Sequence, residues 1–155
     1  MGKLTDQMKE VVERQRLGFV ATVCPDGTPN VSPKGTLCVL DDDHLMFADI
    51  RSPGTVANLR RNPSIELNVV DAIARKGYRF KGRAEVLEAG TDFDRLIADF
   101  AARGVPDAPR RIRAIVVARI EQVRPLISPG YDRDPDEASM KARWMRHYFG
   151  DGGAR

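Results

Sequence analysis

The stretch that decides the fold spans residues 27–63 and reads G-T-P-N-V-S-P-K-G-T-L-C-V-L-D-D-D-H-L-M-F-A-D-I-R-S-P-G-T-V-A-N-L-R-R-N-P. Its apolar runs predict two strands on either side of an acidic turn, and Ser52-Pro53 predicts the start of a helix. Small, hydroxyl and cationic side chains gather at the ends of these elements: Ser32, Lys34, Gly35, Arg51, Ser52, Thr55 and Asn58. Such side chains beside a helix start are typical of an anion site.

Length and composition indicate one globular domain over residues 1–155. The chain has a mass of 17.2 kDa, 42% hydrophobic residues and 30% charged residues, which is ordinary for a folded protein. We see no apolar run long enough to cross a bilayer and no secretory leader pattern, so we expect a cytoplasmic protein without membrane contact. Two cysteines, Cys24 and Cys38, are expected to be small buried apolar residues.

The net charge of +3 is mildly basic. The densest basic cluster combines residues 110–113 with Arg60 and Arg61. A solvated surface accounts for it better than a nucleic-acid stripe does, and a third interpretation is that part of the excess faces phosphate on a small ligand.

Alternation and β-branched runs predict six strands, over residues 18–24, 28–40, 44–49, 64–70, 77–87 and 112–127. The first three read as a meander, with Pro33 at a bulge or an edge. Periodicity predicts helices near residues 5–17, 52–62, 91–104 and 137–149, with Thr5, Ser52 and Thr91 as caps and Gly18 ending the first; residues from about 150 are expected to fray. Tight antiparallel turns with few helices indicate a mainly β protein with peripheral helices, a closed or nearly closed barrel.

The clearest strand, residues 77–87, has two different faces. Tyr78, Phe80 and Gly82 point toward the predicted core, and Gly82 suggests a bend or a close approach. The opposite face is charged and is either wet or part of a basic interface: Arg79, Lys81, Arg83 and Glu85.

Familiar catalytic constellations are missing from the sequence. The two histidines, His44 and His147, lack metal-ligand spacing, and residues 41–43 lack the alternating spacing that wraps calcium. Ser32 has no histidine base nearby, and there is no phosphate-binding glycine loop. We therefore expect no metal and name no catalytic residue.

The anion site remains the best-supported feature. Free N–H groups and the positive end of the helix dipole near Ser52 and Thr55 favour a phosphate, to which Lys34 adds a charge and Ser32 a hydroxyl. The alternative is that the hydroxyls cap turns and the cations are solvated.

Four segments in order resemble one family. V-S-P-K-G, L-M-F-A-D, R-S-P-G-T-V-A-N-L-R-R-N-P and Y-R-F-K-G-R-A-E-V are similar to segments of the pyridoxamine 5'-phosphate oxidase-like family of FMN-binding split β-barrels. The resemblance covers about residues 8–87. It implies a six-stranded antiparallel split barrel and a homodimer with FMN at the subunit interface.

The resemblance also implies positions for the cofactor. Residues along the flavin and its phosphate would be Asn30, Val31, Ser32, Pro33, Lys34 and Gly35. Ala48 and Asp49 would flank the ring, and the phosphate and ribityl oxygens would lie near Arg51, Ser52, Thr55 and Asn58. Trp144 and Arg146 would reach the cofactor of the second subunit.

The leading hypothesis is therefore an FMN-dependent oxidoreductase acting on a small-molecule substrate or electron acceptor. The longer oxidases of the family have an Arg-rich C-terminal substrate segment that this chain lacks, so their particular activity is not implied. A deazaflavin-dependent reductase on the same barrel and a non-catalytic flavin- or heme-binding module are the alternatives. Nucleic-acid binding is disfavoured, because Tyr78 and Phe80 point away from Arg79 and Lys81.

Overall fold

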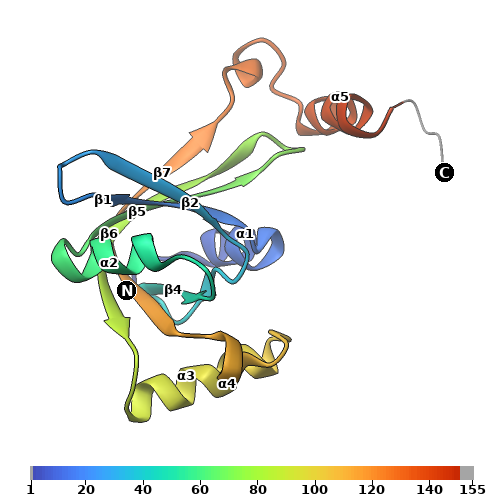
Figure 1. Cartoon of the computed structure of the whole chain (residues 1–155). Helices are drawn as coiled ribbons and strands as arrows, with labels where there is room; N and C mark the ends of the chain where they lie inside the picture. The colour runs from blue at the N-terminus through green and yellow to red at the C-terminus, as the bar shows by residue number, and fades with distance from the viewer. Residues whose placement is uncertain (1, 151–155) are drawn as a thin grey trace.

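One antiparallel sheet of seven strands forms the body of the protein, in a computed structural model that describes residues 2–150 (Figure 1). The strands are β1 (Gly18–Val23), β2 (Pro29–Lys34), β3 (Cys38–Val39), β4 (His44–Asp49), β5 (Ser64–Asp71), β6 (Lys76–Leu87) and β7 (Ala114–Ile127). Their order across the sheet is β2-β1-β5-β6-β7-β4-β3. The sheet curls into a half-barrel, and its two edges, β2 and β3, are consecutive in the chain.

Helices lie around this sheet. They are α1 (Asp6–Gln15), α2 (Pro53–Arg61), α3 (Thr91–Ala102), α4 (Ala108–Arg111) and α5 (Glu137–Phe149), with a 3-10 turn at Pro129–Asp132. The prediction of a mainly β fold with peripheral helices is confirmed. No helix of the described chain combines the length and the apolar character that a membrane crossing requires.

The predicted strand over residues 28–40 is two strands, which corrects the count from six to seven. After Lys34 the chain turns, and the hydroxyl of Thr36 contacts both backbone groups of Ala48: it accepts from the amide at 3.0 Å and donates to the carbonyl at 3.2 Å. A side chain thus binds the backbone of β4 at this point, and the backbone pairing with β4 begins at β3. The pairings of the predicted meander are present, since β1 pairs with β2 and β3 pairs with β4, but the two parts of its middle strand lie at opposite edges of the sheet.

Two helix ends also differ from the prediction. Arg16, in a left-handed conformation with φ of 51°, ends α1, and Gly18 instead begins β1. Gly90, with φ of 97°, precedes α3, so Thr91 is the first helical residue and not the cap.

The two faces of β6 are as predicted. Phe80 is fully buried, and Arg79 and Lys81 are exposed. The pairing of β6 with β7 shifts register between Lys81 and Gly82. A Cβ on Gly82 would lie 1.9 Å from the carbonyl oxygen of Arg119, so this bulge requires glycine.

Two apolar clusters hold these layers together. Inside the curled sheet, the largest fully buried side chains include Phe47, Leu67 and Phe80. A second cluster packs α3 against the sheet. Cys38 is buried in this cluster, and burial raises the pKa of its thiol to about 12, which fits the predicted role of a small apolar residue. Cys24 is only half-buried.

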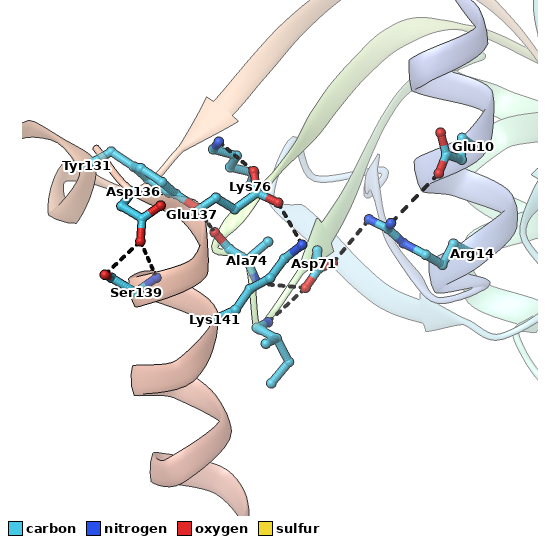
Figure 2. Close-up of polar contacts among 11 residues, drawn as sticks. Glu10, Arg14, Asp71, Ala74, Lys76, Tyr131, Asp136, Glu137, Ser139 and Lys141 are labelled. Carbon is cyan, nitrogen blue, oxygen red and sulfur yellow. Dashed lines mark hydrogen bonds and ion pairs between the residues drawn. The ribbon is translucent and has the colours of Figure 1, made fainter. Parts of the chain in front are cut away.

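Residues 128–149, here called the C-terminal arm, project from the end of β7 and carry α5 away from the sheet (Figure 1). The arm is tied to the turn between β5 and β6 (Figure 2): the Tyr131 hydroxyl donates to the Ala74 carbonyl at 2.6 Å, and Lys76 pairs with Glu137 at 2.8 Å. Hydrogen bonds from Lys141 and Lys76 lower the pKa of the Glu137 carboxyl to about 2. The fraying predicted beyond Gly150 falls outside the described residues.

Candidate functional site

Lys34 is the centre of the site. It is the last residue of β2, and only 4% of its surface is exposed. Its Nζ donates to the Ser32 hydroxyl at 2.5 Å and to the Ser52 hydroxyl at 2.7 Å, and lies 3.5 Å from the Pro33 carbonyl oxygen. Ser32 and Lys34 share a face of β2 because side chains alternate along a strand. The ammonium thus joins β2 to the segment that enters α2.

Two further contacts fix this junction. The hydroxyls of Ser32 and Thr55 are 3.0 Å apart, and Thr55 is buried in the first turn of α2. Asp49, buried at the end of β4, accepts a 2.6 Å hydrogen bond from the Ser52 amide. The Ser52 hydroxyl makes no cap bond to α2, contrary to the prediction, because it accepts from Lys34 instead.

The charge of Lys34 is the unusual feature of this cluster. No ion pair among the described residues includes Lys34, and its bonded partners are neutral oxygens. Burial lowers the pKa of its ammonium, which the nearby Asp49 carboxylate partly offsets. Removing a cation from water is costly unless an anion compensates it. The site is therefore suited to receive an anion.

Backbone near the cation is open to a ligand. A Cβ added to Gly35 or Gly54 would meet no atom within 4 Å. Gly54 stands in the first turn of α2, where amide groups have no helical acceptor and the dipole favours negative charge. Open backbone, a buried cation and two hydroxyls together fit a phosphate group.

Asn30 and Asn58, which were both predicted as site residues, meet at Thr22, which the sequence did not single out. Both amides donate to the hydroxyl of buried Thr22, at 3.2 Å and 3.1 Å, and Asn58 also lies 3.6 Å from the Cys24 sulfur. Thr22 and Thr36 were missed. The only signal for Thr22 was a hydroxyl inside an apolar strand.

The remaining predicted positions are more scattered. Ala48 is buried beside Asp49, whereas Val31 and Pro33 point to the opposite, outer face of β2 and are exposed. Arg51 is exposed next to Ser52. Trp144 and Arg146 lie on α5, where Trp144 stacks on the guanidinium of Arg75 at 4.0 Å. Within one chain, the arm does not bring these two residues to Lys34.

Groups of three or more metal-ligating side chains are absent from residues 2–150.

Comparison with known proteins places the chain among relatives. The family model for pyridoxamine 5'-phosphate oxidase matches residues 4–125. An uncharacterized protein of Methanocaldococcus jannaschii is 32% identical over 90 residues, which are 57% of this chain and 59% of the relative. The match thus spans less than two thirds of that relative's length.

Solved structures of other proteins share the fold. HupZ of Group A Streptococcus superposes with a TM-score of 0.71 at 30% identity, covering 81% of this chain and 95% of HupZ. A candidate pyridoxamine 5'-phosphate oxidase of Lactobacillus delbrueckii superposes with a TM-score of 0.68 at 28% identity, covering 80% of this chain and 95% of its own. The C-terminal arm lies beyond the residues that the family model matches.

Proposed function

The chain belongs to the pyridoxamine 5'-phosphate oxidase family, and from this premise we propose that it is an FMN-binding oxidoreductase whose Lys34 cluster holds the cofactor phosphate. The observation that carries the proposal is the buried Lys34 ammonium, which has neutral partners and no ion pair among the described residues. A phosphate would supply the missing negative charge. When bound, FMN would supply the hydride or electron chemistry.

The residues of the cluster have distinct parts in this proposal. Lys34 would contribute the charge, and Ser52 and Thr55 would donate hydroxyl hydrogen bonds to phosphate oxygens. Asp49 would hold the Ser52 amide and so fix the loop before α2. Asn30 and Asn58, already oriented by Thr22, would face the ribityl chain. Arg51, exposed at the rim, would add a second cation near the phosphate.

A second copy of the chain would complete the site. The outer face of β1 and β2 exposes Phe19 by 50% and Val31 by 61%, which supports burial against a partner. Val31 and Pro33 lie on β2, which is the edge strand that also carries Ser32 and Lys34, so a partner that covers this edge would lie next to the cofactor. We propose a homodimer in which α5 carries Trp144 and Arg146 toward the other copy's flavin.

A spectrum and a titration test the cofactor. Purified protein should show flavin absorbance, or should quench the fluorescence of added FMN with saturable stoichiometry. A parallel titration with the deazaflavin cofactor separates the two phosphate-bearing cofactors. Turnover of a reduced nicotinamide with an electron acceptor then separates an enzyme from a non-catalytic flavin carrier. Failure to bind either cofactor would overturn the proposal.

A further inference from the structure

The outward face of β6 and β7 places like charges opposite each other. Arg79 stands directly across from Arg124, and Arg83 directly across from Arg119. Lys81 lies between these pairs, across from Gln122. Like charges directly opposite on an antiparallel pair destabilise a sheet. Negative charge near these residues would therefore stabilise the sheet, and the described carboxylates provide only part of it.

Among the described residues, one of these cations has a carboxylate partner. Arg79 pairs with Glu66 on β5. Within residues 2–150, the ion pairs include none with Lys81, Arg83, Arg119 or Arg124. Lys81 and Arg124 are thus two cations without an ion pair beside Arg79, and Glu66, which stands across from Lys81 on β5, is bound by Arg79.

At this point the surface is hollowed. A depression of about 100 Å³ is lined by four side chains, Arg79, Lys81, Gln122 and Arg124. Each of the four ends in N–H donors: two guanidinium groups, one ammonium and one amide. Its lining contains no carboxylate. Such a hollow matches a group that has several acceptor oxygens and negative charge, of about the size of one phosphate.

This hollow is separate from the Lys34 cluster. Arg79 and Lys81 point away from the core, whereas Phe80 between them is fully buried on the inner face. Lys34 lies on the inner side as well, 5.6 Å from the ring of buried Phe47. The sheet therefore stands between the two groups of cations.

We propose that the hollow of Arg79, Lys81, Gln122 and Arg124 binds the phosphate group of a small molecule, as a second anion site of this protein. The fork of Arg124 would bind two phosphate oxygens, and Arg79 would donate from the guanidinium N–H groups that its pair with Glu66 does not use. Lys81 would add a point charge and Gln122 an amide hydrogen bond. A bound phosphate would also relieve the repulsion between Arg79 and Arg124. A carboxylate of a second copy would bring the same chemistry, and the experiment separates the two sources.

The test measures thermal unfolding with increasing inorganic phosphate, at constant ionic strength set with chloride. The Lys34→Met protein is used so that the other anion site is silent, and wild-type protein saturated with FMN serves as the second background. Phosphate should raise the melting temperature in both. Adding Arg124→Gln should weaken phosphate binding by about tenfold or more, because a charged hydrogen-bond donor is lost.

Arg124→Gln should have a second effect on the melting temperature, opposite in sign to its effect on phosphate stabilisation. Without phosphate, Arg124→Gln should raise the melting temperature, since the repulsion from Arg79 disappears. Arg111→Gln, which removes an exposed cation on α4, is the matched control and should leave the phosphate response unchanged. A phosphate response that survives Arg124→Gln, or no response at all, overturns the proposal. Loss of a dimer in Arg124→Gln without any phosphate response also overturns it, and assigns the hollow to a carboxylate of the second copy.

Discussion

The affinity of the candidate site for FMN should depend strongly on Lys34, because this residue is its buried cation. Replacing it with methionine keeps most of the buried volume but removes the charge. We expect FMN affinity to fall about tenfold to a hundredfold, the range of one charged hydrogen bond. Fluorescence quenching of FMN measures this. Lys3→Met removes an exposed lysine and should leave the affinity unchanged; equal losses in both variants would contradict the assignment.

The same residue predicts a pH dependence. Burial lowers the pKa of Lys34 from its ordinary value of 10.5, so the free protein loses this proton at a lower pH than the unfolded chain does. FMN affinity should therefore decrease as the pH rises through the lowered pKa, since the phosphate needs the charged form. Over the same window the unfolded chain binds more protons, so the cofactor-free protein should gain stability with pH. Titrations and melting curves at several alkaline pH values check both signs, and Lys34→Met should show neither.

Individual residues show which parts of the site a sequence can predict. Ser32, Lys34 and Thr55 were predicted together, and the structure brings them into contact. The partner of Ser52 was predicted wrongly, because a hydroxyl at a helix start has two possible bonds and the buried ammonium competes with the cap. The contact of Thr22 with Asn30 and Asn58 depends on strand pairing, which local sequence does not encode.

Among the elements, β6 depends on the bulge at Gly82. Gly82→Ala would place a methyl group 1.9 Å from the Arg119 carbonyl oxygen, and neither backbone can move without breaking the ladder. We expect a loss of about 3 kcal/mol in the free energy of unfolding, measured with urea. Gly54→Ala is the matched control: its Cβ meets no atom within 4 Å, and alanine is the better helix former, so stability should not fall. Equal stability of the two variants would contradict the bulge argument.

The C-terminal arm can be followed through Trp144, the only tryptophan in the chain. Glu137→Gln weakens the contacts to Lys76 and Lys141, so acrylamide should quench Trp144 more efficiently, whereas Glu85→Gln should not change the quenching. Global stability should change little, because these ion pairs are exposed.

The ion pairs of Glu137 with Lys76 and Lys141 should also depend on pH. The pKa of Glu137 is about 2, against an ordinary 4.5, so these ion pairs are complete above pH 4.5 and are lost as the pH falls toward 2. The acrylamide quenching of Trp144 in wild type and in Glu137→Gln should become equal in that range. A difference in quenching that stays constant with pH would contradict the role of these ion pairs.

Elements with strong local patterns were predicted almost to the residue. Residues 44–49 were predicted as a strand and form β4, and the predicted helix over residues 137–149 is α5. The break between β2 and β3 was not predictable from local sequence, because it depends on the contact of Thr36 with Ala48. The short helix α4 was not among the predicted helices.

At the scale of the whole molecule, dimerisation is the prediction to test. Val31→Glu would bury a carboxylate in the proposed interface, and we expect the variant to have the mass of one chain, 17.2 kDa, by light scattering, while wild type has twice that mass. Ala98→Glu, at an exposed position of α3, is the control and should remain a dimer. FMN affinity should fall with the dimer, because the partner borders the site. A monomeric wild type would contradict the proposal.

The arrangement of the strands is what sequence reasoning predicted least well. A barrel with peripheral helices followed from alternation and turns, but the order β2-β1-β5-β6-β7-β4-β3 did not. The pairing of β4 with β7 joins residues that are 65 to 75 positions apart, such as Asp49 with Ala114 and His44 with Arg119. Such pairs are selected by the complementarity of whole faces and not by local propensity.

The two edges of the sheet, β2 and β3, have a consequence for the order of events in folding. Lys34 stands on one edge, and Asp49 lies at the end of β4, which pairs with the other edge. The contacts within the site are local in the chain, 18 residues for Lys34 with Ser52 and 23 for Ser32 with Thr55, but β4 is held by β7, whose residues are 65 to 75 positions away. The site is therefore complete only after this distant pairing has formed. A ligand bound there would slow unfolding more than it speeds folding. Cofactor loading would thus lengthen the lifetime of the folded sheet after the pairing of β4 with β7 has formed.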